Sequence, residues 1–288
     1  TNLGIPARPT TAGGPGGQPG AAASPTPVSN SNYPAGLRPE DMAESEIRAG
    51  DSQFQASRNA GFTTALTTGH TGIFSGQSAV INLAGDSVSA IVIKSPFAQH
   101  VSFVTIGGGV YPGSLLGTFS ALRQIFNDAK RLQENQRAYA ADPRAMRRPD
   151  GDRSLEALFP AINRQMPVVF NANREIEIVR ALDFIRDYDL VGIIAGGQEA
   201  GNIAVRLKAQ NVQVLLSLNF PKRTESASSN ADPETLDTLR FRAEVPKTAG
   251  KLAAAGVKCA FHSGGATAAD YFSNAGKAIE NGLARDAA

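Results

Sequence analysis

The sequence predicts an α/β fold, and within that class a TIM-type (β/α) barrel that is incomplete at one or both ends. Four apolar runs follow one another from Pro167 to the C-terminus, and each precedes a stretch with helical periodicity. The runs are short and apolar on both faces, as strands of a buried parallel sheet are. An open doubly wound sheet is the alternative, but no G-x-G-x-x-G motif follows a strand, which weakens a dinucleotide-binding version of it.

Caps and breakers place the elements of the second half. A helix over residues 115–141 should end before Asp142-Pro143, and a shorter helix over 152–165 has Asp152 or Ser154 as its N-cap. Pro246 is expected to kink or split the third of the four later helices. The four strand–helix pairs are 167–172 with 174–187, 190–196 with 198–210, 212–218 with 233–256, and 257–265 with 267–283.

The first part of the chain differs in character. Residues 1–36 are rich in Gly, Pro, Ala, Ser and Thr, and they carry too little apolar surface to offset the entropy of ordering them, so we expect a flexible segment. The remainder, 37–288, is expected to form the partial barrel. A helix is expected over 39–58, an earlier strand of the barrel over 61–68, and a β-rich excursion near residues 71–106.

Bulk composition excludes several classes of partner. The chain of 288 residues has 42% hydrophobic and 19% charged residues and a formal net charge of +2, so no nucleic-acid or membrane surface is implied. The single Cys259 excludes an internal disulfide and a cysteine-only zinc site. No apolar run approaches about 18 residues, so we expect no membrane-spanning segment. The compartment is left open, and because the chain starts with Thr in a loop-like stretch, we expect further sequence to precede it.

Polar or glycine-rich residues follow the predicted strands, where a β/α barrel places its functional site. Turn formation alone would also give this pattern. We expect a pocket that binds a small polar ligand through hydrogen bonds. Gly196 to Ala200 could present backbone N–H groups to an anion, although Glu199 would repel a phosphate and a tight turn explains the stretch equally. The expected ligand-binding residues are His70, Asn171, Asn173, Arg174, Gln198 and Asn219.

Several stretches together resemble the amidohydrolase superfamily, and most of all its imidazolonepropionase-like and prolidase-like branch. They are GFTTAL followed by GIFSGQSAVINLAG, PVVFNANR, IIAGGQEA and GVKCAFHSGG, and the resemblance covers the chain from Gly61 to its end. It implies a metal-dependent β/α barrel that hydrolyses C–N bonds of linear or cyclic amides. It also implies a fragment, because the family's first barrel strand, with its His-x-His, would precede residue 1.

The same resemblance places the family's metal ligands on residues that bind metals poorly. The two histidines of the P-V-x-x-H-A-H-R pattern correspond to Asn171 and Asn173, the histidine of I-E-H-G to Gly196, and the aspartate after the last strand to Gly264. An amide oxygen is a poor zinc donor, and glycine offers no side-chain ligand. We expect no metal at the standard site, and zinc or another divalent ion only if the family chemistry survives with unusual ligands.

Two functional hypotheses follow. The first is a hydrolase acting on C–N bonds of non-peptide or dipeptide amides, in which His262 serves as acid, base or lone metal ligand. The second is a catalytically inactive barrel that binds a small polar ligand, or that pairs with an intact second barrel or another copy of itself. Without a metal, bound water keeps a pKa near ~15.7, so the usual nucleophile is missing. Bound metal in the purified protein would discriminate between the two.

Overall fold

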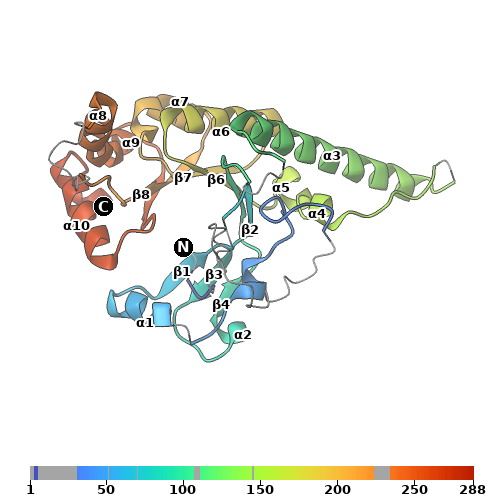
Figure 1. Ribbon diagram of the computed structural model, residues 1–288, viewed down its shortest axis with the longest axis horizontal. Coiled ribbons are helices and arrows are strands. Elements are labelled where there is room, and N and C mark those ends of the chain that lie inside the picture. The colour runs from blue at the N-terminus through green and yellow to red at the C-terminus, as the bar shows by residue number, and fades with distance from the viewer. Residues whose placement is uncertain are drawn as a thin grey trace, which may run out of the picture.

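A computed structural model describes residues 3–5, 31–50, 52–69, 71–106, 111–144, 146–223 and 234–288. These residues form two β-sheets, one with six strands in the order β2-β5-β6-β7-β8-β9 and one with three in the order β1-β3-β4. Figure 1 shows helices α3, α6 and α7 along one side of the large sheet and the small sheet at the far side of the molecule. The bounds of the strands are β1 Thr64–Thr67, β2 Phe74–Gln77, β3 Ala79–Asn82, β4 Val92–Lys94, β5 Gln99–Ser102, β6 Val168–Ala172, β7 Gly192–Gly196, β8 Gln213–Ser217 and β9 Cys259–His262.

Strands β5 to β9 run parallel to their neighbours, and β2 joins the edge antiparallel to β5. Parallel neighbours need a crossover connection, which explains the helices that separate these strands in the sequence. The helices are η1 Ala43–Glu46, α1 Ser52–Asn59, α2 Val88–Ile91, α3 Leu115–Ala141, α4 Arg153–Glu156, α5 Phe159–Ile162, α6 Glu175–Tyr188, η2 Ala200–Ile203, α7 Ala204–Ala209, α8 Leu236–Glu244, η3 Val245–Lys247, α9 Thr248–Ala254, α10 Ala268–Glu280 and η4 Arg285–Ala287.

The barrel prediction is confirmed only as a mixed α/β fold with a parallel sheet. Within the described ranges the six-stranded sheet is open, because β2 and β9 form its two edges and do not pair. The earlier strand expected to belong to the barrel, β1, lies instead in the small sheet, antiparallel to β3. The buried Thr67 hydroxyl of β1 also donates to the Leu3 carbonyl at 2.9 Å, which attaches residues 3–5 to this sheet.

The predicted β-rich stretch near residues 71–106 contains β2, β3, β4 and β5, but it is not a separate excursion. Strands β2 and β5 belong to the large sheet, whereas β3 and β4 belong to the small one. The continuous helix expected over 39–58 is also wrong: η1 and α1 are two short helices with Gly50 between them. Of the segment expected to be flexible, residues 6–30 lie outside the described part, so that boundary stays a prediction.

The helix boundaries predicted from N-caps and helix-breaking residues agree more closely with the structure than the predicted barrel does. Helix α3 spans the predicted Leu115 to Ala141, and the helix interrupted by Pro246 is split into α8, η3 and α9. The Asp152 carboxylate accepts the backbone N–H groups of Ser154 and Leu155 at 2.9 and 3.1 Å, as an N-cap does. The helix expected over 152–165 is nevertheless divided into α4 and α5, with Pro160 in the first turn of the second.

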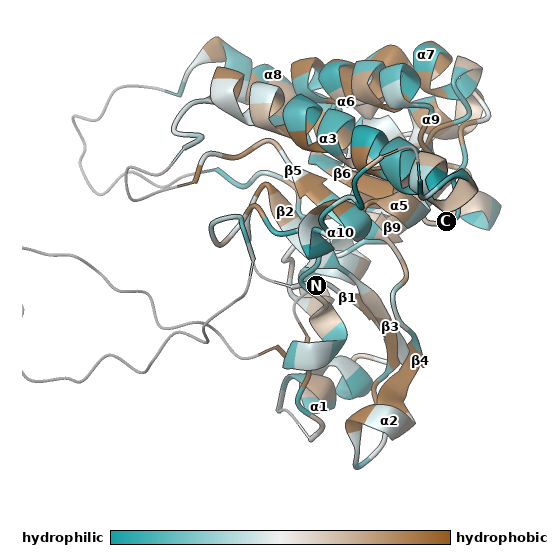
Figure 2. Ribbon diagram, turned by 90° about the vertical axis from the view of Figure 1, so that its right-hand side faces the viewer, coloured by the Kyte–Doolittle hydropathy of each residue, from teal (hydrophilic) through white to brown (hydrophobic). Residues whose placement is uncertain are grey.

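Two large hydrophobic cores and a small cluster of Ala98, Val169 and Ala195 hold these layers together. The larger core lies between the parallel sheet and its helices, where Phe170 and Ile194 of the strands meet Phe126 and Leu182 of α3 and α6. Each fully buried side chain of this size stabilises the fold by about 1.5–3 kcal/mol relative to exposure. Figure 2 shows the strands as mostly hydrophobic and α3 and α6 as alternating, which is the pattern of helices covering a sheet. The smaller core packs α1, η1 and the small sheet around Phe54.

No helix among the described residues is both long and apolar enough to cross a membrane.

Candidate functional site

The C-terminal ends of β6, β7, β8 and β9 carry a group of uncharged side chains, which we call the strand-end cluster. Register brings them together, because Ala172 pairs with Gly196 and Ser217 pairs with His262 across neighbouring parallel strands. The opposite face of these strands is committed to the large core through residues such as Phe170. Alternation along each strand therefore turns the polar residues away from the helices. The cluster consists of Asn171, Asn173, Gly196, Ser217, Asn219, His262 and Gly264.

His262 joins two strand ends through its ring. The N–H of Gly196 lies 3.1 Å from Nε2, and the N–H of Gly264 lies 3.1 Å from Nδ1. Burial lowers the pKa of His262 to about 4, so its ring is neutral at physiological pH. A neutral ring whose nitrogens both face backbone donors is poorly placed to take a proton from a substrate. The role of His262 as acid, base or metal ligand stays a prediction.

Asn219 connects the β8 end to the loops on either side. Its Nδ2 donates to the Gly264 carbonyl at 3.0 Å, and its backbone N–H donates to the Ser217 hydroxyl at 3.2 Å. The Asn219 carbonyl accepts from Nε2 of Gln198 at 2.7 Å, and the Gln198 carbonyl accepts from the Thr248 hydroxyl at 2.7 Å. These bonds fix the loops after β7, β8 and β9 relative to one another.

Asn171 and Asn173 lie at the end of β6, and both side chains are exposed. Nδ2 of Asn171 donates to the Ser102 hydroxyl of β5 at 2.8 Å. The Asn173 carboxamide makes no hydrogen bond to any described residue, although its Oδ1 lies against Gly196. Ser102 was missed by the sequence reasoning, because nothing local to it predicts which residue β5 would place beside Asn171.

The two glycines at the expected metal positions have no room for a side chain. A Cβ added to Gly196 would lie 2.4 Å from Oδ1 of Asn173, and one added to Gly264 would lie 2.0 Å from Oγ of Ser217. Both glycines also have positive φ angles, 99° and 57°, which disfavour any other residue. Neighbouring polar side chains therefore fill the space into which His and Asp ligands would project.

The donor set does not fit a zinc ion. Such a site needs imidazole nitrogens or carboxylate oxygens at about 2.0–2.2 Å, whereas the cluster offers carboxamides, one hydroxyl and a single imidazole. Within the part of the chain that the structure describes, no three His, Cys, Asp or Glu side chains group to hold a metal ion. No catalytic step through a metal follows from these residues.

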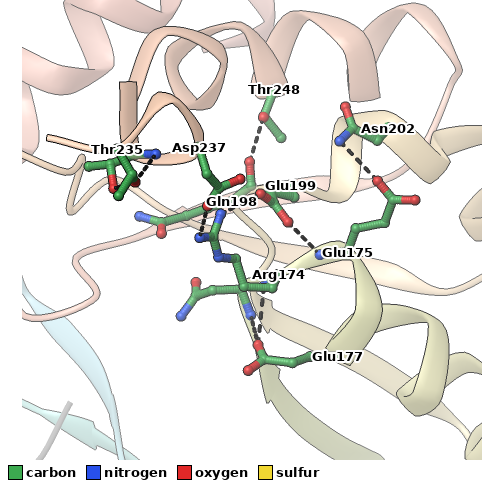
Figure 3. A network of polar contacts seen from close by, with 11 residues as sticks. Arg174, Glu175, Glu177, Gln198, Glu199, Asn202, Thr235, Asp237 and Thr248 are labelled. Carbon is green, nitrogen blue, oxygen red and sulfur yellow. Dashed lines mark hydrogen bonds and ion pairs between the residues drawn. The ribbon is translucent and has the colours of Figure 1, made fainter. Parts of the chain in front are cut away.

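Arg174 is committed to a different group of contacts, beside the N-terminus of α6. Figure 3 shows its guanidinium between Glu199 and Asp237, at 2.7 and 2.8 Å, and it also lies over the Phe241 ring, 4.2 Å from the centroid. The hydrogen bond to Glu199 is the main reason that the pKa of Arg174 is raised. These contacts attach α8 to the ends of β6 and β7, so the guanidinium has protein partners in place of a ligand.

At the N-terminus of α6, the carboxylates of Glu199 and Glu177 occupy the positions that a bound anion would take. Glu199 accepts the N–H of Glu175 at 2.7 Å, and Glu177 accepts the N–H groups of Asn173 and Arg174 at 2.9 and 3.1 Å. Negative side chains at a helix N-terminus stabilise it and exclude phosphate by charge repulsion. In the stretch from Gly196 to Ala200, the N–H groups of Gly197, Glu199 and Ala200 donate to backbone carbonyls at 2.8–2.9 Å, as in the tight turn that the sequence also allowed.

Of the other two histidines, the structure describes His100 alone. His70 lies outside the described residues, so its predicted ligand role is a prediction still. His100 is on β5, only 4% exposed, and its Nε2 has no hydrogen-bond partner among the residues described. Burial lowers the pKa of His100 to about 3.

A cavity of about 130 Å³ lies beside the Arg174 contacts, with Asn202, Phe241 and Thr248 among its lining residues. Its lining includes Glu199, Asp237 and Glu244, but each of these carboxylates is paired with Arg174 or with lysines of the following turns. Sequence reasoning missed the contribution of α8, because its contacts depend on how the helix returns over the sheet.

Comparisons with known proteins agree with this architecture. No protein-family model and no curated protein sequence matches the chain. Among solved structures, the chain is similar to an amidohydrolase from Thermotoga maritima, with a TM-score of 0.72 and 18% sequence identity. The match covers 88% of this chain and 64% of that one, so the chain spans less than two thirds of the other protein's length. At this identity the likeness concerns the fold, and the chain has an amidohydrolase-like α/β fold.

Proposed function

We propose that this chain is an amidohydrolase-type domain that binds a small, polar ligand at its strand-end cluster and does not hydrolyse it with a metal ion. The observation that carries the proposal is the steric one at Gly196 and Gly264. Asn173 and Ser217 fill the volume of the missing ligand side chains, so the cluster is packed for hydrogen bonding. A metal site that had lost one ligand alone would keep that volume open.

The free hydrogen-bonding capacity of the cluster indicates the kind of ligand. Oδ1 of Asn171, Oδ1 of Asn219 and the whole Asn173 carboxamide have no partner within the described ranges, and all three side chains are exposed. Carboxamides offer both donors and acceptors without charge. Binding should therefore depend only weakly on ionic strength, in contrast to a site built on ion pairs.

Metal content and ligand binding together test this proposal. The protein, purified without chelator and dialysed, is expected to contain zinc, manganese and iron far below one equivalent. A thermal-shift screen of small amides and polyols should give compounds that stabilise the wild type and Asn59→Ala, an exposed control on α1, but that do not stabilise Asn173→Ala. A full equivalent of metal, or binding that survives Asn173→Ala, would reject the proposal.

A hydrolase acting on C–N bonds is the second candidate, and the likeness of the fold to an amidohydrolase favours it. In that case the protein holds a divalent metal through unusual ligands, with His262 as the one imidazole of the cluster. It predicts about one equivalent of metal that is lost in His262→Ala, and turnover of amide substrates that stops when the metal is removed.

We further propose that the open sheet is part of an incomplete barrel of the imidazolonepropionase-like and prolidase-like kind, completed by an intact partner barrel or a second copy. Two observations support this: β9 is an edge without a further strand among the described residues, and the match covers only 64% of the similar structure. Analytical ultracentrifugation tests the homo-oligomer, since a strictly monomeric chain at micromolar concentration would exclude it.

A further inference from the structure

We infer that the strand-end cluster receives a carbonyl-type oxygen of its ligand between Nδ1–H of His262 and the N–H of Gly264. This inference rests on the proposal that the cluster binds a ligand without a metal, and it adds the chemical group that the site recognises. It follows from a conflict in the hydrogen bonds of His262.

A neutral imidazole has one N–H and one lone pair, so only one of its nitrogens can accept a hydrogen bond. Both nitrogens of His262 nevertheless face a backbone N–H at 3.1 Å, one from Gly196 and one from Gly264. In either tautomer, one ring N–H therefore points at a backbone N–H. Protonation of the ring would place such a conflict on both sides, so it gives no relief.

The surroundings decide which contact is the true hydrogen bond. Gly196 is buried at the end of β7, and the next N–H, of Gly197, donates to the Ala172 carbonyl at 2.8 Å. The Gly196 N–H is thus held in the sheet and cannot turn away from Nε2. Gly264 is exposed in the loop after β9 and is followed by Gly265, also exposed. We therefore place the lone pair on Nε2 and the proton on Nδ1.

This assignment leaves two donors, Nδ1–H of His262 and the N–H of Gly264, side by side at the exposed edge of the cluster. The Ser217 hydroxyl is next to Gly264 and accepts the Asn219 N–H at 3.2 Å, but the Gly264 N–H is directed at Nδ1 of His262 and makes no hydrogen bond to this hydroxyl. Oδ1 of Asn219 is turned from the Gly264 N–H, because the Nδ2 of the same carboxamide donates to the Gly264 carbonyl.

Nearby carboxylates do not supply an acceptor either. Asp270, the closest in sequence, pairs with Lys222, and Glu177 and Glu199 are bound at the start of α6. The Gly264 N–H lies in an exposed loop and can turn from Nδ1. Two adjacent donors without a protein acceptor then select an oxygen with two lone pairs, as in an amide, a carboxylate or an ester. Because the cluster is uncharged, it does not by itself discriminate a neutral amide from a carboxylate.

Nitrogen NMR of the uniformly ¹⁵N-labelled full chain at pH 7.5 tests the inference. In the absence of added ligand, the ring of His262 is expected to carry its proton on Nδ1. Acetamide and sodium acetate are then titrated separately at constant ionic strength. At least one of them should shift the Gly264 amide and the His262 ring resonances along a saturable curve, while the Gly282 amide, which donates to the Ile279 carbonyl at the end of α10, stays in place.

His262→Gln should abolish the saturable shift at Gly264. The tautomer of the His262 ring in the wild type is a second measurement, which does not depend on a variant that folds. Saturation by acetate alone assigns a carboxylate ligand, and saturation by acetamide alone assigns an amide. A proton on Nε2, or the absence of a saturable shift with both compounds, would overturn the inference. Failure of the proposed function looks different, because it appears as a full equivalent of bound metal.

Discussion

At the residue scale, the strand-end cluster is defined by which side chains fill which volumes. Ser217 Oγ and Asn173 Oδ1 sit where a Cβ on Gly264 or Gly196 would go, so each glycine is required by a polar neighbour. This packing opposes the return of a metal ligand at residue 264. An aspartate there would clash with Ser217 and would have to adopt a positive φ of 57°.

Gly264→Ala should lower the free energy of unfolding by about 2 kcal/mol or more, since the new methyl group overlaps Ser217 and the backbone favours glycine. Gly276→Ala is the matched control: Gly276 is inside α10, and a Cβ there meets no atom within 4 Å. The control should raise the free energy of unfolding by about 0.5–1 kcal/mol. Urea denaturation measures both, and equal effects of the two changes would contradict the packing argument.

The two buried histidines predict a loss of stability in mild acid. Burial lowers the pKa of His262 to about 4 and that of His100 to about 3, below the unfolded value of about 6.5. The unfolded chain therefore binds more protons between these values and pH 6.5. The stabilisation is complete above about pH 6.5 and is lost as pH falls towards 4 and then 3.

At pH 5 each histidine should cost up to about 2 kcal/mol relative to pH 7.5. Urea unfolding at both pH values measures the contribution of each histidine to this loss of stability. The proteins compared are the wild type, His100→Gln and His262→Gln. The wild type should lose more stability on acidification than either variant. An identical pH dependence in all three proteins would show that neither ring is held neutral by the fold.

At the scale of elements, α8 is unusual because polar contacts hold it. None of its residues is buried, and its attachment depends on Asp237 and Phe241, which contact Arg174 at the start of α6. Ion pairs this exposed contribute little to global stability. They can still decide whether α8 stays docked, because this helix buries little apolar area that would hold it in place without them.

Arg174→Ala should increase amide exchange in residues 236–244 by about five-fold, with α3 unchanged. Arg186→Ala is the control, because Arg186 pairs with Asp183 and Asp187 of its own helix, α6, and does not contact α8 through an ion pair. Hydrogen exchange with mass spectrometry measures both variants. Unchanged protection of α8 in Arg174→Ala would mean that Phe241 alone suffices to dock it.

At the scale of the whole molecule, an aromatic group joins the two cores across the open sheet. Phe62, beside the small sheet, contacts Tyr271 and Phe272 of α10 with ring centroids 5.5 and 5.9 Å apart. Phe62 packs on the smaller core and Tyr271 on the larger one. The contact therefore couples the N-terminal and C-terminal parts, which are far apart in the sequence.

Phe62→Ala should lower the free energy of unfolding by about 1–2 kcal/mol and broaden or divide the thermal transition, because the two cores lose a shared contact. Ile93→Ala provides the comparison, since Ile93 is 54% exposed on β4 and bridges nothing. Scanning calorimetry measures both. A single sharp transition in Phe62→Ala, at the melting temperature of the Ile93→Ala protein, would show that the aromatic contact does not couple the cores.

The sequence by itself determined the elements whose signals are local. Helix α3 was predicted from its periodicity and the Asp142-Pro143 stop, the Asp152 cap from its side chain, and the break at Pro246 from the missing N–H. The amides at the end of β6 and the glycines after β7 and β9 could also be recognised as candidate site residues. Each of these predictions depends on residues within one or two turns of each other.

Only the tertiary structure decided which sheet β1 joins, and which partners His262 and Arg174 take. The pairs Gly196–His262 and Arg174–Asp237 lie 66 and 63 residues apart, and no local pattern encodes contacts over such distances. They form because burial of the large core sets the register of the strands, and that register brings the loop residues into reach. Hydrophobic periodicity therefore specifies the elements, whereas packing between distant elements specifies the site.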